Sequence, residues 1–595
     1  MDYDCIVIGG GHAGIEASLA VSRMGFNCLL ITQNPDTIGA LSCNPAMGGL
    51  SKGNIIREVD ALGGEIAKLC DKSMIQYRVL NRSRGAAVQA PRIQADKKIY
   101  QAAARSSLEK QKGLTIFMDT VIDLLTEDCS SPDNGSVKCS KKVCGVLTRR
   151  GHSISSRTVI LAAGTFMEGK IFIGEYDALQ GRLGEEAALG LGQSLRRMGF
   201  PMGRLKTGTP ARIAGDSIDY DAMEKQDGEE PAPFSFDTVP GTWKALLTQL
   251  PCWITYTSPA THEIVRKNIH RSAMYAGKIE GTGARYCPSM EDKVMRFPER
   301  DRHHVFVEPE GIYTKEVYLN GLSTSLPEDV QADYIHTVKG LEEAVIVRPG
   351  YAVDYDYIDP LDLYPSLESK RLAGFFSAGQ TNGSSGYEEA AAQGLIAGIN
   401  AVQKLLGAEP LILGRAEAYT GVLIDDLTTL GTKEPYRMFT SRAEHRLVLR
   451  HDSADTRLSP RARELGLIDD ERWENFNKKV QGLEIIKELL NKKSHINDSE
   501  LNSFPEEWVE RALLDKKYAG YIEKEKRAAA KLTKMDHVKI PHNMDYYSIN
   551  GLSSEAKEKL SKVQPLTIGQ ASRIPGIRQG DIALLMILSR NKKIM

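Results

Sequence analysis

The sequence predicts an α/β protein with an N-terminal domain of strands and helices, a mixed α/β insertion and an α-helical C-terminal region. Three observations support this prediction. A short apolar run at residues 3–8 precedes a glycine-rich turn and a helical pattern. Residues from about 200 to 350 combine Pro, Gly and aromatic residues with strand-like alternation. Beyond about residue 411, charged amphipathic helical patterns replace the strand signals.

The length of the chain predicts several domains. It has 595 residues, 42% of them hydrophobic and 26% charged, which is ordinary for a globular protein. A single hydrophobic core does not grow to this size. We assign residues 1–200 to the first part of the N-terminal domain and 201–350 to the insertion. Residues 351–410 are a return to the N-terminal domain, and 411–595 form the helical domain.

Composition also predicts where the protein works. No stretch approaches the roughly 20 apolar residues that span a bilayer, and the first apolar strand begins after four residues, which leaves no room for a signal peptide. We expect a cytoplasmic protein without membrane association. The nine cysteines lack zinc-binding spacing, so we expect free thiols and no metal site. Because the net charge is −1, nucleic-acid binding requires local basic patches.

Each expected element follows from a local pattern. A stretch rich in Ser, Asp, Asn and Lys at 128–142 predicts a surface loop. Strands are expected at 3–8, 27–32, 158–163 and near 375, and helices from the glycine turn to residue 24 and at 387–406, 470–490 and 506–532.

The turn after the first strand carries Gly9-x-Gly11-x-x-Gly14 and opens a helix, which is the context of a Rossmann-type dinucleotide site. The helix N-terminus attracts phosphates, and Gly10, His12 and Ala13 complete the turn. A glycine-rich turn that binds nothing is the alternative. The second strand ends in Thr32-Gln33 without the usual acidic residue, so neutral groups must hold the ribose and the dinucleotide's identity stays open.

Two later segments point to FAD. Residues 158–165 resemble the strand that returns under the nucleotide in two-dinucleotide, glutathione-reductase-like flavoproteins, and residues 376–380 resemble their later strand toward the ribityl chain. This resemblance implies FAD contacts at Val121, Gly164, Gln380 and Gly386. The helix that follows Gly386 is expected to direct its N-terminal backbone amides at the flavin ring. The alternative is a helix that only packs on the sheet, which has the same sequence pattern.

Longer blocks resemble the MnmG (GidA) family of tRNA-modifying flavoproteins. They are spread along nearly the whole chain, at 42–49, 57–64, 283–293, 377–398, 431–442 and 572–576. The resemblance implies that NADH reduces FAD and that methylenetetrahydrofolate supplies a one-carbon unit for carbon 5 of the wobble uridine in the tRNA anticodon. Ammonium or glycine completes the group. It further implies a homodimer and a GTPase partner, MnmE, which docks near 574–587; a C-terminal packing helix is the alternative there.

Two cysteines are candidates for the chemistry. Carbon 5 of uracil becomes nucleophilic only after a group adds to carbon 6, and a thiolate both attacks and leaves readily. Cys43 and Cys287 lie in Gly/Pro-rich loops; we favour Cys287 as the nucleophile and Cys43 as a proton-transfer aid, with inert thiols as the alternative. Arg285 and Lys293 are either charges that favour a Cys287 thiolate or surface residues. The resemblance places NADH contacts at Gly283, Arg285, Tyr286 and Lys293.

A basic cluster at 437–450 is the candidate RNA surface. Arg437, Arg442 and Arg446 are mixed with aromatic side chains, a composition suited to phosphates and unstacked bases. Arg450, His445, Tyr436 and Phe439 belong to the same cluster. An exposed helix with internal salt bridges is the alternative. The same alternative is favoured for the basic residues at 524–534.

Three rival functions remain open. A folate- and FAD-dependent tRNA uracil methyltransferase would lack the long helical region after residue 411. A fumarate-reductase-like flavoprotein would need no RNA-facing surface. An RNA-binding scaffold would keep FAD as a structural element only.

Overall fold

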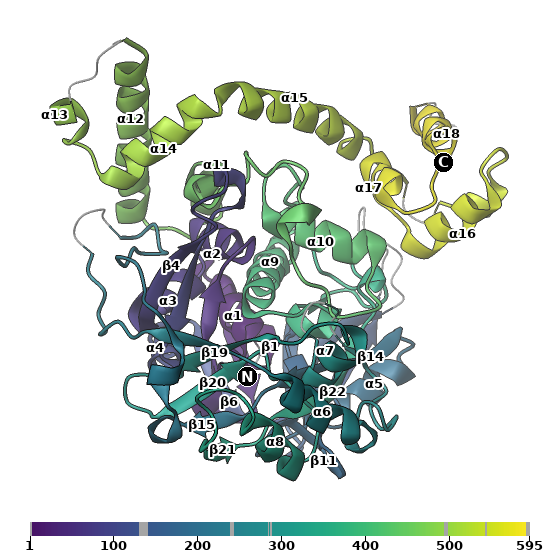
Figure 1. Cartoon of the computed structure of the whole chain (residues 1–595). Coiled ribbons are helices and arrows are strands. Elements are labelled where there is room, and N and C mark those ends of the chain that lie inside the picture. Colours follow the sequence, from purple (N-terminus) through teal and green to yellow (C-terminus); the bar gives the residue numbers. More distant parts are fainter. Residues whose placement is uncertain are drawn as a thin grey trace.

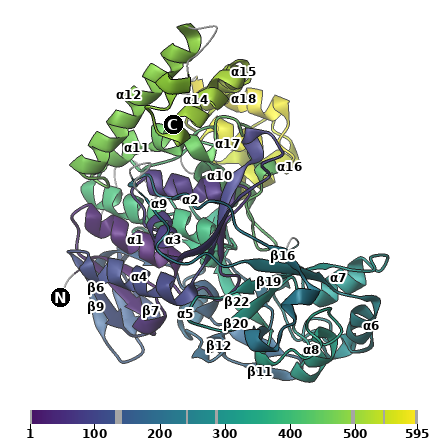
Figure 2. The same ribbon diagram turned by 60° about the vertical axis from the view of Figure 1, so that its left-hand side comes forward.

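The computed structural model describes residues 3–129, 141–238, 243–283, 285, 288–492, 498–541 and 544–590. Strands and their covering helices form one body, and helices α12 to α18 lie across one end of it (Figure 1). After rotation the insertion, with β19, β20, β22, α6 and α8, lies at the opposite end from those helices (Figure 2). Among the described helices, none is both long and apolar enough to cross a membrane.

The N-terminal domain is built on a seven-stranded sheet. Its order is β6 (Leu114–Met118), β2 (Cys28–Thr32), β1 (Tyr3–Ile8), β9 (Ser153–Leu161), β8 (Lys141–Thr148) and β7 (Val121–Asp128), with β23 (Phe375–Ser377) also paired to β9. β1 pairs in parallel with β2 and β9. Its apolar residues from Cys5 onward are fully covered, as expected for a strand buried on both faces. The predicted loop at 128–142 lies largely outside the described residues.

Two helices pack closely on this sheet. α1 (His12–Arg23) lies against α9 (Tyr387–Leu406), whose bounds are those expected from the sequence. Small residues permit the approach: a Cβ at Gly394 would lie 2.1 Å from the Ala13 carbonyl oxygen, and one at Gly398 would lie 2.7 Å from that of Ala17. The pair brings the N-termini of both helices to the same side of the sheet, at one cleft.

The insertion contributes two further sheets. One has the order β11 (Tyr176–Ala178), β10 (Lys170–Ile173), β22 (Tyr351–Ile358), β14 (Met202–Thr209) and β18 (Thr282–Gly283). The other has the order β16 (Glu224–Gln226), β17 (Cys252–Tyr256), β19 (His304–Pro309), β20 (Glu316–Asn320), β15 (Arg212–Ala214) and β21 (Ile346–Arg348). The helices here are α6 (Pro259–Lys267), α7 (Met290–Arg296) and α8 (Glu328–Ile335). Because β22 pairs with β14, residues 351–358 belong structurally with the insertion's sheet, and the boundary at 350 stays a prediction.

A third small sheet and four helices complete the central body. The sheet joins β3 (Ala46–Gly48), β5 (Ala90–Ala95) and β4 (Met74–Leu80), and the helices are α2 (Lys52–Ala61), α3 (Ile66–Ser73), α4 (Lys97–Lys110) and α5 (Leu191–Arg197). Apolar residues between 411 and 468 share one hydrophobic core with α1, α2 and α9. The start of the C-terminal region is therefore packed into the central body.

The helical region consists of α10 (Tyr419–Leu430), α11 (Ala454–Glu464), α12 (Asp470–Lys492), α13 (Asp498–Leu501), α14 (Glu506–Lys517), α15 (Ala519–Asp536), α16 (Ser554–Val563), α17 (Ile568–Arg573) and α18 (Gln579–Arg590). The single helix expected at 506–532 is wrong. Tyr518 leaves helical geometry (φ −105°, ψ 11°) and separates α14 from α15. The helices α16 to α18 enclose a small core of their own.

Candidate functional site

A cleft of about 480 Å³ opens where the N-terminal domain meets the insertion. Its walls come from the β1–α1 turn, the end of β9, the end of β14 and the start of α9. Ligand pockets usually have volumes of about 300–1,000 Å³ and lie between domains. The cleft is therefore large enough to hold a sizeable organic cofactor.

The glycine turn forms one wall because each glycine has a different steric reason to be there. Gly9 has φ +106°, and a Cβ on it would lie 2.4 Å from the Ala162 carbonyl oxygen. A Cβ on Gly14 would lie 1.8 Å from the Gly9 carbonyl oxygen, so Gly14 allows the turn to close. Apart from its own chain neighbours, no described residue places an atom within 4 Å of a Cβ built on Gly11. Gly11 thus leaves open space at the N-terminus of α1, where phosphates bind.

His12 occupies the first position of α1 and faces the same cleft. The side chain is buried and its ring stacks on Tyr387, with centroids 4.6 Å apart. Its Nε2 has no hydrogen-bond partner among the described residues. Burial lowers the pKa of His12 to about 4 against an opposing effect of Glu388, so the ring is neutral near pH 7. A buried nitrogen with unused hydrogen-bonding capacity fits a site that a polar ligand completes.

The remaining residues expected to bind FAD lie around this cleft. Gly10, Ala13, Val121, Gly164, Gln380 and Gly386 line it together with Gly9, Gly11 and His12, whereas Gly14 packs behind them. Thr32, Gln33 and Asn34 supply neutral groups at the end of β2. This placement brings together residues that are up to 377 positions apart in the chain.

An ion triad that sequence reasoning missed stands at the N-terminus of α9. Lys52 Nζ lies 2.8 Å from Glu388 Oε2 and 3.1 Å from Glu389 Oε2. Gly386 has φ +123°, and a Cβ there would collide with Glu389 and Lys52. Lys52 offsets the charge of one of the two carboxylates beside the cleft, and no local pattern signals the triad because Lys52 is 336 residues from Glu388.

Cys43 lines the same cleft as the glycine turn. Its backbone N–H donates to the Tyr387 hydroxyl at 2.8 Å, and its Sγ lies 2.9 Å from the Tyr318 hydroxyl. The thiol also faces the Gly208 carbonyl oxygen at 3.8 Å. The thiol is half-buried between these two oxygens, while the backbone is fixed by Tyr387.

The second cysteine and one of the residues expected to bind NADH, Cys287 and Tyr286, lie outside the described residues. Gly283 pairs with Lys206 between β18 and β14, and Arg285 is exposed. Lys293 donates its Nζ proton to the Gly321 carbonyl oxygen at 2.6 Å. Neither Gly283 nor Arg285 nor Lys293 is among the residues that line the cleft. The NADH contacts stay a prediction.

The candidate RNA cluster is not a helix. Its described backbone is irregular, with short 3₁₀ turns at Thr440–Arg442 and His451–Ser453, so the expected alternative of a salt-bridged helix is wrong. Arg437 lines the cleft and Arg446 is exposed. Arg450 is only 3% exposed and pairs with Asp452 and Asp515, which leaves it no access to a phosphate. The inclusion of Arg450 in the cluster is therefore corrected, and the same applies to the buried His445.

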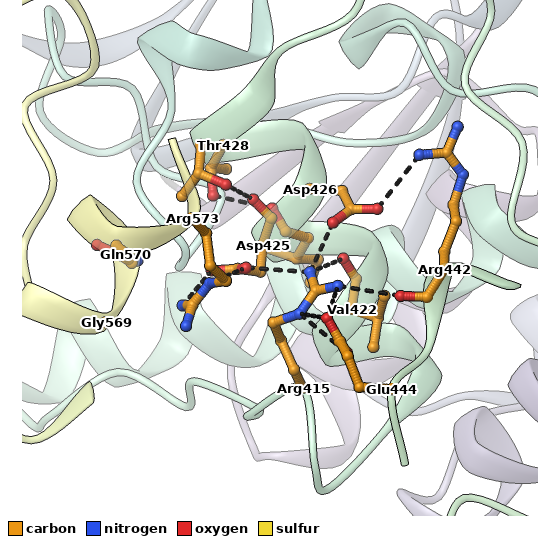
Figure 3. Close-up of polar contacts among 12 residues, drawn as sticks. Arg415, Val422, Asp425, Asp426, Thr428, Arg442, Glu444, Gly569, Gln570 and Arg573 are labelled. Carbon is orange, nitrogen blue, oxygen red and sulfur yellow. Dashed lines mark hydrogen bonds and ion pairs between the residues drawn. The ribbon is translucent and has the colours of Figure 1, made fainter. Parts of the chain in front are cut away.

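Arg442 is held by a network of ions that Figure 3 shows. Its guanidinium stacks on Tyr436 at 4.3 Å and reaches Asp426 at 3.4 Å. Arg415 contacts Asp426 at 2.5 Å and Asp425 at 3.1 Å, while Arg573 of α17 contacts Asp425 at 2.7 Å. The network joins the C-terminal helices to α10 and to the candidate RNA segment.

No group of three or more His, Cys, Asp or Glu among the described residues is arranged to hold a metal ion.

Comparison with known proteins places the chain in a family. Residues 4–409 match the family described as "Glucose inhibited division protein A", and residues 528–594 match "tRNA modifying enzyme MnmG/GidA C-terminal helical bundle". The chain is 54% identical to the "tRNA uridine 5-carboxymethylaminomethyl modification enzyme MnmG" of Borreliella afzelii, covering 100% of this chain and 99% of the relative. It is 50% identical to the protein of the same name in Treponema denticola, covering 99% of each.

A solved structure agrees with these relatives. Aquifex aeolicus GidA in its form I crystal superimposes with a TM-score of 0.90 at 45% identity and covers 99% of this chain and 100% of its own. The agreement includes both the cleft-forming domains and the helical region. The chain is a member of the MnmG (GidA) family.

Proposed function

We propose that the protein is an FAD-dependent enzyme that modifies carbon 5 of the wobble uridine in tRNA. One observation carries the proposal: the glycine turn, the Cys43 thiol and Arg437 all open onto the same cleft. A cofactor-binding turn, a nucleophilic sulfur and a cation suited to phosphate are the groups that a flavin-dependent reaction on an RNA base needs in one place. The names of relatives at 50% and 54% identity support the same reaction.

The residues present fit FAD. The space at Gly11 and the unused Nε2 of His12 suit the pyrophosphate end, and Gln380 and Gly386 suit the flavin end. Val121 and Gly164 complete the wall. When bound, the flavin supplies redox and one-carbon transfer chemistry, with NADH and methylenetetrahydrofolate as co-substrates.

The protein's own residues would orient the base and exclude water. Arg437 would hold a phosphate of the anticodon at the rim while Arg442 and Arg446 extend the cationic surface. Cys43 would exchange a proton with the base, and Cys287 would add to carbon 6. We further propose a homodimer in the cytoplasm, with residues 201–350 on the NADH side and residues 411–595 binding tRNA and the GTPase MnmE.

The test is mass analysis of tRNA nucleosides after incubation with the protein, the GTPase, NADH and methylenetetrahydrofolate. Cys43→Ser and Cys287→Ser are expected to retain bound flavin and lose modification. Cys144→Ser is the matched control, because Cys144 lies on β8 and does not line the cleft. A flavin-containing protein that binds tRNA but modifies nothing under these conditions would support the scaffold function instead.

A further inference from the structure

A polar cluster that does not line the cleft contacts Cys43. Its centre is Tyr318, which is only 2% exposed and whose hydroxyl lies 2.9 Å from Cys43 Sγ. Strand register explains its position, because β20 pairs with β15 so that Tyr318 stands opposite Arg212. Directly opposed residues on one face of an antiparallel pair interact through their side chains.

Two cations lie over the Tyr318 ring. The Arg212 guanidinium is 5.0 Å and the Lys97 ammonium 5.5 Å from the ring centroid, within the range of a cation–π interaction. Glu310 joins them: Arg212 Nε lies 3.0 Å from its carboxylate, and Lys97 Nζ binds the same oxygen. Two positive charges and one negative charge leave this largely buried cluster with an excess positive charge.

The excess positive charge of the cluster affects the pKa of Lys97. Burial, and secondarily the charge of Arg212, lowers the pKa of Lys97 to about 8, while Glu310 and an ionised Cys43 act in the opposite direction. The cluster therefore gains stability from one more negative charge. Cys43 is the group that can supply it beside the Tyr318 hydroxyl.

We propose that Tyr318 is a positioning residue for Cys43, donating a hydrogen bond to the Cys43 thiolate while Arg212 and Lys97 supply the compensating positive charge. The S–H bond of Cys43 breaks, its proton passes to solvent in the cleft, and Tyr318 keeps its own proton. Arg212 also donates to the Ser42 carbonyl oxygen at 2.8 Å, which fixes the loop that presents the thiol. The role of Cys43 in catalysis rests on the proposed function; its hydrogen bond to Tyr318 does not.

Other polar groups face this sulfur. The Gly208 carbonyl oxygen accepts a hydrogen bond from the neutral Cys43 thiol at 3.8 Å. Glu308 stands opposite Tyr318 on β19, where it is buried and pairs with Arg92 at 2.8 Å. Tyr351 and Tyr387 are further ionisable groups near the sulfur, and Arg182 binds the Ser42 hydroxyl.

The experiment measures the alkylation rate of Cys43 by iodoacetamide across about pH 6 to 9, with peptide mass analysis, in the flavin-loaded protein. Tyr318→Phe removes only the hydroxyl, and the pH of half-maximal rate is expected to rise by about one unit, the effect of one hydrogen bond to a charged group. Tyr334→Phe is the matched control, since this buried hydroxyl donates to the Leu322 carbonyl oxygen instead.

If Tyr318→Phe does not fold, a second pair of variants tests the same proposal. Lys97→Met is expected to raise the same pH midpoint, whereas Lys98→Met, exposed one position further along α4, is expected to leave it unchanged. Midpoints that match the unmodified protein in both Tyr318→Phe and Lys97→Met would overturn the proposal. Full tRNA modification by Cys43→Ser would instead refute the catalytic role of Cys43, and the alkylation profile separates the two results.

Discussion

Gly11→Ala separates the stability of the fold from the affinity for flavin. Gly11 has φ −78° and ψ −173°, a conformation open to any residue, and apart from its own chain neighbours no described residue places an atom within 4 Å of the added Cβ. The methyl group enters only the space proposed for the pyrophosphate. We expect FAD affinity to fall about 5- to 150-fold, because a steric overlap of one methyl group costs about 1–3 kcal/mol.

The flavin-free protein should respond differently. Alanine in place of glycine at the helix N-cap costs a few tenths of a kcal/mol to about 1 kcal/mol. It also recovers about 0.4–1 kcal/mol by restricting the unfolded chain, so the two effects nearly offset. The melting temperature of the flavin-free Gly11→Ala variant should therefore stay close to that of the unmodified protein.

Gly14→Ala is the contrasting variant. Its Cβ would lie 1.8 Å from the Gly9 carbonyl oxygen, so the turn itself must move and we expect a loss of about 3 kcal/mol or more together with the flavin. Calorimetric titration with FAD and thermal melting of both variants are the assays. Undiminished FAD affinity in Gly11→Ala would refute the placement of the pyrophosphate at this turn.

Three further predictions concern charge. Burial lowers the pKa of His12 from its usual 6.5 to about 4, so folding favours the neutral ring. The folded state has this stability in full above pH 6.5 and loses about 3 kcal/mol of it as the pH falls toward 4. Denaturant melts of His12→Gln should show a smaller change of the unfolding free energy with pH over that window. Arg446→Ala should weaken tRNA binding and reduce its salt dependence without lowering the melting temperature. Arg450→Ala should cost about 3–5 kcal/mol of stability, because buried Asp452 loses its ion pair with Arg450 and Asp515 is left with Lys487 and Arg511; equal melting temperatures would contradict the difference. Arg415→Ala removes the cation that contacts both buried carboxylates, which leaves Asp425 with Arg573 and Asp426 with Arg442. It should destabilise the fold more than Arg105→Ala, whose partners Asp36 and Glu109 are exposed, as measured by chemical denaturation.

Elements that depend on patterns of neighbouring residues could be predicted from the local sequence. The strand at 3–8 and the helix at 387–406 follow from apolar runs and small-residue spacing. The glycine turn was predictable from its spacing between a strand and a helix, although only some of its contacts are local: Gly14 meets Gly9 within the turn, whereas Gly9 meets Ala162 after β9. The cleft position of Cys43 was expected only through the resemblance to a family.

Residues whose roles depend on distant partners escaped sequence reasoning. Tyr318 and Arg212 meet through strand pairing, and Lys97 reaches them from a helix more than a hundred positions away. Arg450 looked like Arg446 because both stand in one basic stretch, yet only the fold brings Asp515 to neutralise Arg450. Burial of a charge is decided by tertiary packing, which a composition pattern does not contain.

The first turn of α1 carries no Lys or Arg, so the attraction for an anion at its N-terminus comes from peptide dipoles. Dipoles of the main chain have no proton to gain or lose, and their pull on an anion is the same in acidic and alkaline buffer. His12 titrates at that end of the cleft about 3 units below neutrality, near the carboxylate of Glu388. Flavin retention should thus form a plateau across the neutral range, and its acid edge should include the protonation of His12.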